Sequence, residues 1–295
     1  MTAMNETVKI AIIPNLSKSG TQRTADECIC RIKECGGEVL MREDMRTAFP
    51  DCGVTFCGDI DELCERADII LTIGGDGTII HAAYHASFHE KPLLGINMGR
   101  LGFVAELESN ELDMLDRLFT GEYTIEKRMM LKIIHQGETE DKTFYAVNDA
   151  VISRGSFSRL IDIDVSLTSD QGYICNYRAD GLIFSTPTGS SAYSLAAGGP
   201  VVESTMKCIL MTPVCSHSLF ARPVVFSHYS RIAVSASCDD DTEVFLTVDG
   251  AKTIVVRRGD ALLISEADKV AEFIKLKDRS FYRILQDKFN ERGRR

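Results

Sequence analysis

The chain has 295 residues, a length that fits one large domain or two unequal ones. Apolar residues make up 44% and charged residues 26%, and no run approaches the ~20 apolar residues of a membrane span. The net charge of -10 argues against a nucleic-acid partner, because phosphate backbones select for clustered Lys and Arg.

The cysteines and the N-terminus indicate the compartment. The ten cysteines form no C-x-x-C pair, and no basic segment followed by an apolar run marks a signal peptide. We therefore expect a cytosolic protein, without a membrane partner, whose thiols are reduced and serve as small apolar side chains.

The first part of the chain alternates between apolar runs and segments with helical spacing. We expect strands at residues 8–14, 68–73 and 92–96 and helices at residues 21–35, 61–66 and 78–87. Strands separated by helices predict a parallel sheet covered on both faces. We assign residues 1–122 to this α/β domain.

From residue 123 onward, short β-rich runs dominate. We expect strands at residues 129–135, 143–152, 161–167, 173–178, 181–185, 231–236, 243–248, 253–256 and 261–264. Regularly spaced strands predict an all-β second domain, of two packed sheets, over residues 123–278. Residues 280–289 form an amphipathic helix, and we expect the segment 279–295 to pack back onto the first domain.

The strongest signal of the first domain is the turn GGDGT at residues 74–78, between a buried strand and a helix. Glycines let the backbone approach a phosphate, and the N–H groups of a helix N-terminus favour anions. The carboxylate of Asp76 would repel phosphate, which predicts contact with a hydroxyl or a metal ion. A tight turn with a capping Asp is the simpler alternative, but ligands tend to bind at the carboxyl end of a parallel strand.

A second signal lies at residues 180–193, where a strand ends at hydroxyl residues, a Pro-x-Gly turn and the start of a helix over residues 190–197. Such a turn offers N–H donors, hydroxyls and the aromatic face of Tyr193 to a nucleotide. A capped helix after a strand, with Tyr193 in the core, explains the composition equally well.

Three histidines, His81, His85 and His89, recur every four residues after GGDGT. No H-E-x-x-H pattern accompanies them, so a solvated or half-buried helix face explains the spacing better than a metal site. We expect His81 to line the site and His85 to be structural.

The chain resembles the bacterial NAD kinases in six segments that follow one another along it. They are GGDGT, NMGRLGF from Asn97, VNDAV around Asn148, DGLIFSTPTGSSAYSLAAGGP from Asp180, HSLFARPVV from His217 and the VDG that ends at Gly250. GGDGT alone is weak, since diacylglycerol kinases, sphingosine kinases and phosphofructokinases have similar turns. The long segment from Asp180 is much more specific.

The resemblance implies an NAD kinase-like fold of two domains, with the dinucleotide bound between them. It implies a phosphotransferase that converts NAD to NADP with ATP, or polyphosphate, as the donor. A divalent cation, Mg²⁺, would bridge the donor phosphates, and no all-protein metal cage is expected. We also expect a homo-oligomer, either a dimer or a tetramer.

The resemblance also assigns residues to roles. The family's proposed base falls on Asp76, which would accept the proton of the ribose 2′-hydroxyl. The residues expected to hold the nucleotides are Gly75, Gly77, Thr78, His81, Phe103, Asn148, Asp149, Arg178, Asp180, Thr188, Ser191, Ala192, Tyr193, Ser194, Leu195 and Ala196. Arg159 is added as a cation near the strand of Asn148.

Two departures from the family and two rival functions stand beside this interpretation. Asp149 replaces the usual Glu, so its carboxylate reaches one methylene less, and Ala251 replaces a frequent Gln.

A lipid kinase would share GGDGT but should show an exposed apolar surface or a membrane anchor. A non-catalytic NADP-binding module would keep the segment from Asp180 but lose the acidic group at Asp76.

Overall fold

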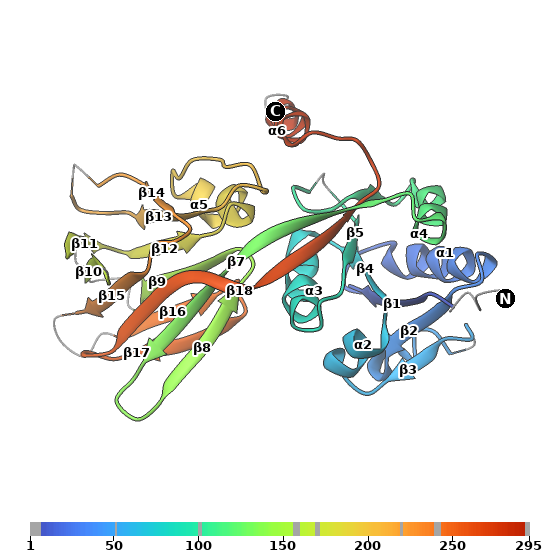
Figure 1. The fold of residues 1–295 in the computed structure, drawn as a ribbon, viewed down its shortest axis with the longest axis horizontal. Coiled ribbons are helices and arrows are strands. Elements are labelled where there is room, and N and C mark those ends of the chain that lie inside the picture. Colours follow the sequence, from blue (N-terminus) through green and yellow to red (C-terminus); the bar gives the residue numbers. More distant parts are fainter. Residues whose placement is uncertain are drawn as a thin grey trace. The chain divides into compact units, whose positions relative to one another are not determined.

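A computed structural model gives the structure of residues 7–50, 52–99, 102–155, 160–168, 172–218, 221–238 and 243–292 (Figure 1). The chain divides into two compact units. Unit 1 comprises Met1–Lys127 and Ala271–Arg295, and unit 2 comprises Arg128–Val270. The chain leaves unit 1 within strand β7 (Thr124–Gln136) and returns to it within strand β18 (Ala261–Lys275).

Unit 1 is built on a parallel sheet with the strand order β3-β2-β1-β4-β5. Its strands are β1 (Lys9–Pro14), β2 (Glu38–Arg42), β3 (Thr55–Cys57), β4 (Ile69–Gly74), β5 (Leu93–Asn97) and the short β6 (Leu107–Glu108). Its helices are α1 (Thr21–Glu34), α2 (Ile60–Arg66), α3 (Asp76–Phe88), α4 (Arg117–Thr120) and α6 (Phe281–Arg292), with 3-10 turns η1 (Glu43–Met45) and η2 (Leu112–Asp116).

Both faces of this sheet are covered, because successive side chains of a strand point to opposite faces. Ile12 of β1 and Ile73 of β4 belong to one core cluster with Ile32 of α1. On the other face, Ile79 of α3 lies against Gly95 of β5, where any larger side chain would collide with it. The prediction of an α/β domain with a doubly covered parallel sheet is therefore confirmed.

Strands β1 and β4 are neighbours, and the order of the chain reverses between them. In open α/β sheets of this kind, ligands bind outside the carboxyl ends of the strands at such a switch point. The loop after β1 and the GGDGT turn after β4 both begin there, and the backbone N–H of Asn15 donates to the Ile73 carbonyl at 2.8 Å. The topology therefore places these two loops at the position best suited to a ligand.

A buried carboxylate anchors the returning C-terminal segment within unit 1. Glu106 is 8% exposed, and it accepts hydrogen bonds from the backbone N–H groups of Leu276 and Lys277 at 2.9 and 2.8 Å. The ammonium group of Lys275 pairs with the same carboxylate. These bonds satisfy a charge that would be costly to bury alone.

Unit 2 consists of two packed sheets. The first is antiparallel with the order β14-β13-β12-β9-β16-β17, and the second contains β11-β10-β15-β18, with β7 pairing to β18 and β8. The remaining elements are β8 (Asp141–Ala146), β9 (Asp149–Arg154), β10 (Ile161–Leu167), β11 (Tyr173–Ala179), β12 (Gly181–Ser185), β13 (Cys208–Val214), β14 (Val224–Ser227), β15 (Ile232–Ser237), β16 (Val244–Val248), β17 (Lys252–Val256), η3 (Thr188–Ser191) and α5 (Tyr193–Ala196). Alternate side chains of both sheets form one core, which confirms the predicted all-β architecture.

Two local predictions differ from the structure. The single strand expected over residues 143–152 is wrong, because the chain turns at Val147 and Asn148 between β8 and β9. The helix expected over residues 190–197 is shortened to the 3-10 turn η3 and the four-residue α5, with a break at Ala192. Both departures fall within the segments that resemble the NAD kinases.

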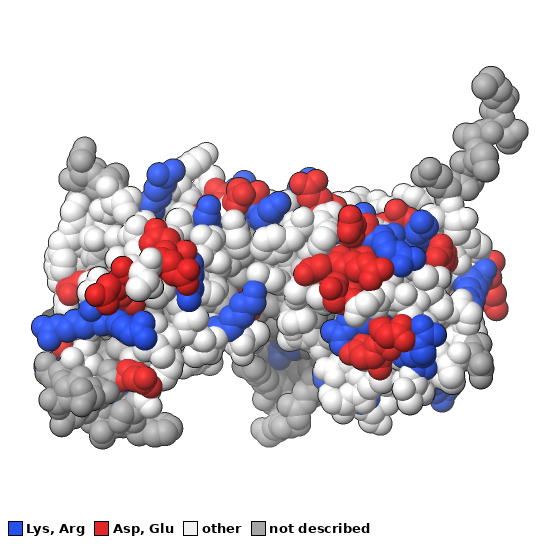
Figure 2. All heavy atoms as spheres, turned by 90° about the horizontal axis from the view of Figure 1, so that it is seen from below, with Lys and Arg blue, Asp and Glu red and all other residues white. Residues whose placement is uncertain are grey.

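Acidic and basic side chains are interspersed on the face of the molecule shown in Figure 2. Over the described ranges, no helix is long and apolar enough to cross a membrane.

Candidate active site

The GGDGT turn of unit 1 joins the end of β4 to the first turn of α3. Helix α3 begins at Asp76, and Gly75 before it provides no side-chain cap, so the first N–H groups of the helix have no side-chain acceptor in this position. The amide of Asn15, in the loop after β1, donates to the hydroxyl of Thr78 at 3.1 Å. This bond ties the two loops of the switch point together.

The carboxylate of Asp76 is held by the segment that follows β5. Its two oxygens accept hydrogen bonds from the backbone N–H groups of Phe103 at 2.9 Å and Val104 at 3.3 Å. A side chain at Gly102 would collide with the same carboxylate, so this position requires glycine. Phe103, expected as a nucleotide contact, thus orients Asp76 through its backbone, while its ring lies 5.1 Å from the ammonium of Lys288.

A lysine that the sequence analysis overlooked lies beside the GGDGT turn. The ammonium of Lys18 donates to the Met98 carbonyl at 3.3 Å, and it occupies the space that a side chain at Gly75 would need. A pocket of about 540 Å³ opens beside it, lined by Leu16, Lys18, Ser19, Gly20, Gln22, Arg23 and Asp26. A lysine in the loop after the first strand was the only signal available in the sequence.

Two histidines of α3, His81 and His85, differ in their surroundings. Nδ1 of His85 lies 3.1 Å from a carboxylate oxygen of Asp61, which accepts the hydrogen bond, and this bond is the main cause that lowers the pKa of Asp61. His81 lies on the exposed side of α3, with its ring 5.0 Å from that of His85.

In unit 2, the segments VNDAV (residues 147–151) and STPTG (residues 185–189) are brought together by the pairing of β9 with β12. Asp149 lies opposite Ser185, the Thr186 N–H donates to the Asn148 carbonyl at 2.9 Å, and the Thr186 hydroxyl donates to the Val147 carbonyl at 2.7 Å. A side chain at Gly189 would collide with the backbone of Asn148. The two segments therefore form one structure, although about 40 residues separate them.

Asp249, in the turn between β16 and β17, binds the turn between β8 and β9. Its carboxylate accepts hydrogen bonds from three consecutive backbone N–H groups, those of Val147 at 2.7 Å, Asn148 at 2.8 Å and Asp149 at 2.9 Å. These bonds hold the turn that divides the single strand expected over residues 143–152. The VDG segment marked this position by resemblance, but no pattern in the sequence connects Asp249 with Asn148.

Two polar groups where β9 and β12 meet are buried without a hydrogen-bond partner among the described residues. They are the side-chain oxygen of Asn148 and the hydroxyl of Thr188. The carboxyl group of Asp149 is also buried, with 6% of the residue exposed, and only burial and the charge of Asp249 are the causes that shift its pKa. Because an unpaired buried polar group costs about 1–3 kcal/mol, a ligand that supplies hydrogen bonds to Asn148 and Thr188 would recover this free energy.

Burial, and then the negative charge of Asp249, raise the pKa of Asp149 to about 7. Burial raises the pKa of Asp249 as well, although its three N–H donors act in the opposite direction. Those donors favour the ionised form at Asp249, whereas Asp149 has none. The pair therefore holds its negative charge on Asp249 and its proton on Asp149 near neutral pH.

The turn after β12 is fixed by its own hydroxyl groups. The Ser190 hydroxyl donates to the Pro187 carbonyl at 2.6 Å, and the Ser194 and Thr212 hydroxyls lie 2.8 Å apart in the core. Ser191 bonds the Thr188 carbonyl at 3.3 Å. These bonds leave Ala192, Tyr193 and Ala196 exposed and Leu195 half-buried.

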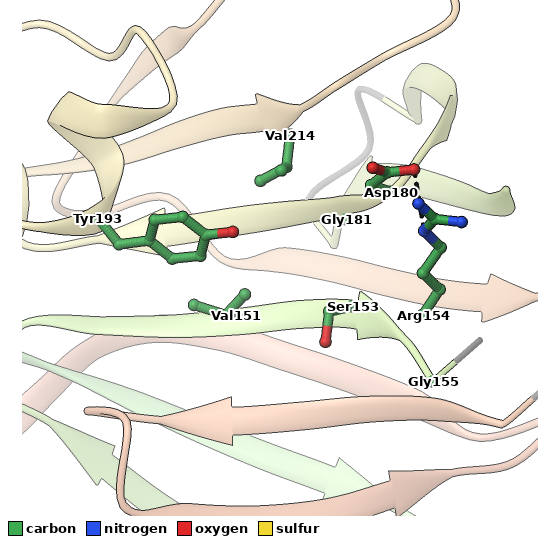
Figure 3. A pocket seen from close by; sticks show the side chains of 8 residues that line it. All are labelled: Val151, Ser153, Arg154, Gly155, Asp180, Gly181, Tyr193 and Val214. Carbon is green, nitrogen blue, oxygen red and sulfur yellow. Dashed lines mark ion pairs between the residues drawn. The ribbon is translucent and has the colours of Figure 1, made fainter. Parts of the chain in front are cut away.

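A pocket of about 210 Å³ lies next to this turn (Figure 3). Tyr193, 47% exposed, lies at one end, and at the other Arg154 pairs with Asp180 at 2.9 Å. Val151, Ser153, Gly155, Gly181 and Val214 complete the lining. Sequence reasoning found Asp180 and Tyr193 but missed Arg154. Arg178 lies exposed on β11, and Arg159 lies outside the described residues.

A glycine-rich turn at the switch point of a parallel sheet, joined to a second unit with buried unpartnered polar groups, is typical of nucleotide-binding proteins. Comparison with known proteins identifies the family. Residues 10–123 match the ATP-NAD kinase N-terminal domain, and residues 147–276 match the ATP-NAD kinase C-terminal domain.

Relatives and solved structures agree with these matches. The NAD kinase of Carboxydothermus hydrogenoformans is 40% identical, covering 83% of this chain and 87% of that protein. The NAD kinase of Moorella thermoacetica is 38% identical, covering 97% and 91%. Yeast NADH kinase complexed with NADH shares the fold with a TM-score of 0.85 at 23% identity, over 96% of this chain and 86% of that one. The chain belongs to the NAD kinase family.

The raised pKa of Asp149 generates a prediction about stability. An Asp in the unfolded chain titrates near ~3.9, so between about pH 4 and pH 7 the folded state binds a proton that the unfolded state has lost, and the free energy of unfolding falls as pH rises. The Asp149→Asn variant cannot titrate at this position, so its free energy of unfolding should not fall in this way. We expect the variant to gain on the order of 4 kcal/mol over the wild type at pH 8 and only about 1 kcal/mol at pH 4.5.

Urea unfolding of both proteins at the two pH values measures this difference. Equal gains at pH 4.5 and pH 8 would show that Asp149 is ionised in the folded protein at both.

Proposed function

We infer that this chain phosphorylates NAD to NADP with ATP as the phosphoryl donor. The observation that carries this inference is the match to both ATP-NAD kinase domains, with 38–40% identity to NAD kinases over most of the chain. NADP differs from NAD by a phosphate on the 2′-oxygen of the adenosine ribose, so the acceptor is that hydroxyl.

We place the acceptor nucleotide against the unpartnered groups of unit 2. The side-chain oxygen of Asn148, the Thr188 hydroxyl and the Asp149 carboxyl are buried acceptors that ribose hydroxyls can satisfy. Tyr193 offers a ring on which a base can stack, and Asp180 with Arg154 lies across the pocket from it. Ser191, Ala192, Ser194, Leu195 and Ala196 form the turn that carries this ring.

We place the donor phosphates at the switch point of unit 1. The N–H groups of Gly75 and Gly77 would approach the ligand, while Thr78, whose N–H donates to the Gly75 carbonyl at 2.9 Å, would offer its side chain, and Lys18 adds a positive charge beside them. Asp76 would accept the proton of the 2′-hydroxyl, because Phe103 and Val104 orient its carboxylate by two hydrogen bonds. Phosphoryl transfer depends mainly on positioning and charge stabilisation, which such fixed groups provide.

A divalent cation, Mg²⁺, fits this arrangement as a partner of the donor phosphates. Mg²⁺ uses one or two carboxylates together with substrate phosphates rather than an all-protein cage. Across the described ranges, no group of three His, Cys, Asp or Glu side chains could hold a metal ion. Asp76 is the carboxylate within the GGDGT turn, where we place the donor phosphates. When bound, the ion would neutralise charge on the transferred phosphate.

Location and assembly complete the proposal. We place the protein in the cytosol, in keeping with ten cysteines that are all free thiols. We also propose that it forms a dimer or a tetramer. The exposed apolar side chains of Val225, on the edge strand β14, and of Tyr229 beside it favour contact between copies.

Incubation of the purified protein with NAD, ATP and Mg²⁺ tests the function directly, with NADP formation as the measurement. We expect the wild type to form NADP and the Asp76→Asn variant to lose about 10²–10⁴-fold in turnover, because a general base contributes this much. Folding and NAD affinity should change little. Near-normal turnover in the folded variant would remove Asp76 from the role of base, and no NADP from the wild type would refute the function.

The two glycines around Asp76 separate ligand binding from positioning. The Cβ atom of Gly77→Ala meets no described atom within 4 Å, so alanine should stabilise helix α3 by about 0.5–1 kcal/mol. If donor phosphates occupy that space, the variant should raise the KM for ATP several-fold. Gly102→Ala, which crowds Asp76, should instead lower kcat. An unchanged KM for ATP in the stabilised Gly77→Ala variant would argue against phosphate binding at this turn.

Tyr193→Ala tests the placement of the acceptor. Base stacking on an aromatic ring contributes about 1–3 kcal/mol, so the KM for NAD should rise about tenfold or more while that for ATP changes less. Stability should hold, because the ring is half exposed. Tyr173→Ala, on the exposed side of β11, is the control and should change neither constant. A rise in the ATP constant alone would reverse our assignment of the two nucleotides.

A further inference from the structure

In the turn between β16 and β17, Asp249 has a backbone conformation that is uncommon for a residue other than glycine. Asp249 and Gly250 both have positive φ angles, 47° and 67°, and the Ala251 N–H donates to the Val248 carbonyl at 3.0 Å. Asp-Gly is a common pair in such hairpin turns, where the Asp side chain is ordinarily solvated. Here the carboxylate instead lies against the backbone of residues 147–149.

Three N–H donors that converge on one carboxylate select for a charged acceptor. One oxygen of Asp249 accepts from Asn148 and Asp149, and the other accepts from Val147. An Asn at this position would keep one acceptor but turn an NH₂ group toward a backbone donor. The turn between β8 and β9 therefore depends on a carboxylate that lies about 100 residues further along the chain.

The Asp249 backbone binds the same turn in the reverse direction, since its N–H donates to the Asp149 carbonyl at 2.9 Å. Asp149 begins β9 and Asp249 lies in the neighbouring turn after β16, and the charge of Asp249 raises the pKa of Asp149. Lys252, at the start of β17, is the cation that acts on Asp249, and no cation acts on Asp149 among the described residues. The pair therefore favours a single negative charge, located on Asp249.

We propose that Asp249 is a positioning residue for NAD: its carboxylate, held by the backbone N–H groups of residues 147–149, shapes the turn that presents Asn148 and Asp149 to the nucleotide. This inference rests on the proposed function, because NAD is the ligand that the turn presents. It adds a residue that does not touch the substrate but decides both the geometry and the protonation of residues that do.

Titration of NAD into the protein from pH 5.5 to pH 8.5 tests this role. For the wild type, we expect the Kd to change with pH across a midpoint near pH 7, where Asp149 titrates. Asp249→Asn should weaken NAD binding about tenfold or more, through loss of charge-assisted bonds, and move the midpoint down by roughly one pH unit or more. The shift is downward because a neutral neighbour no longer opposes ionisation of Asp149.

Asp260→Asn is the matched control. Asp260 is also buried in unit 2 and also accepts a backbone N–H, that of Arg257 at 2.8 Å, while it pairs with His135. Its loss should lower stability but leave the NAD affinity and the midpoint at wild-type values. A merely structural role for Asp249 would give the two variants the same phenotype and would overturn the proposal.

Asp149→Asn keeps the test decisive if Asp249→Asn does not fold. This variant retains the three bonds of Asp249 but cannot titrate, so the pH dependence of NAD affinity near pH 7 should disappear. Retention of the wild-type pH dependence would overturn the proposal. A carboxyl-carbon NMR titration of Asp149 in the free protein needs no ligand, so it still tests the coupling if the wild type binds no NAD and the proposed function fails.

Discussion

Strands β9 and β12 pair antiparallel, with Asp149 opposite Ser185, and this pairing brings together two segments that are distant in the sequence. Thr186 reinforces it with bonds to the carbonyl groups of Val147 and Asn148. The consequence is that polar groups of Asn148 and Thr188 are enclosed without partners. Burying such groups costs stability, and a ligand that supplies their hydrogen bonds recovers it. The binding role that we propose for unit 2 thus depends on the strand register that forms its core.

The two units use the same physical device for different purposes. In unit 1, the N–H groups of Phe103 and Val104 hold the carboxylate of Asp76. In unit 2, the carboxylate of Asp249 holds N–H groups of the turn that contains Asn148. A charged acceptor bonded to backbone donors is directional and strong, because the donors belong to a framework that does not rotate. One unit fixes in this way the carboxylate that we propose as the base, and the other fixes the turn that we propose to bind NAD.

Local sequence signals predicted much of the fold, including strands at residues 161–167 and 181–185 with the observed bounds. They failed where distant residues decide the local structure. The strand expected over residues 143–152 is divided because Asp249 captures the N–H groups of its middle. Lys18 was missed for a similar reason, since only the neighbouring ends of β1 and β4 bring it beside Gly75. Hydrophobic periodicity contains no information about such contacts.

The resemblance to the NAD kinases identified most candidate residues, but it gave no reason for their positions. The central claim is that NAD completes the hydrogen bonds that the fold of unit 2 leaves open. A crystal structure of the protein with NAD bound tests this claim most directly. We expect hydroxyl or amide groups of NAD within hydrogen-bonding distance of the Asn148 side-chain oxygen, the Thr188 hydroxyl and the Asp149 carboxyl. A bound NAD that leaves all three groups unpaired would contradict the account.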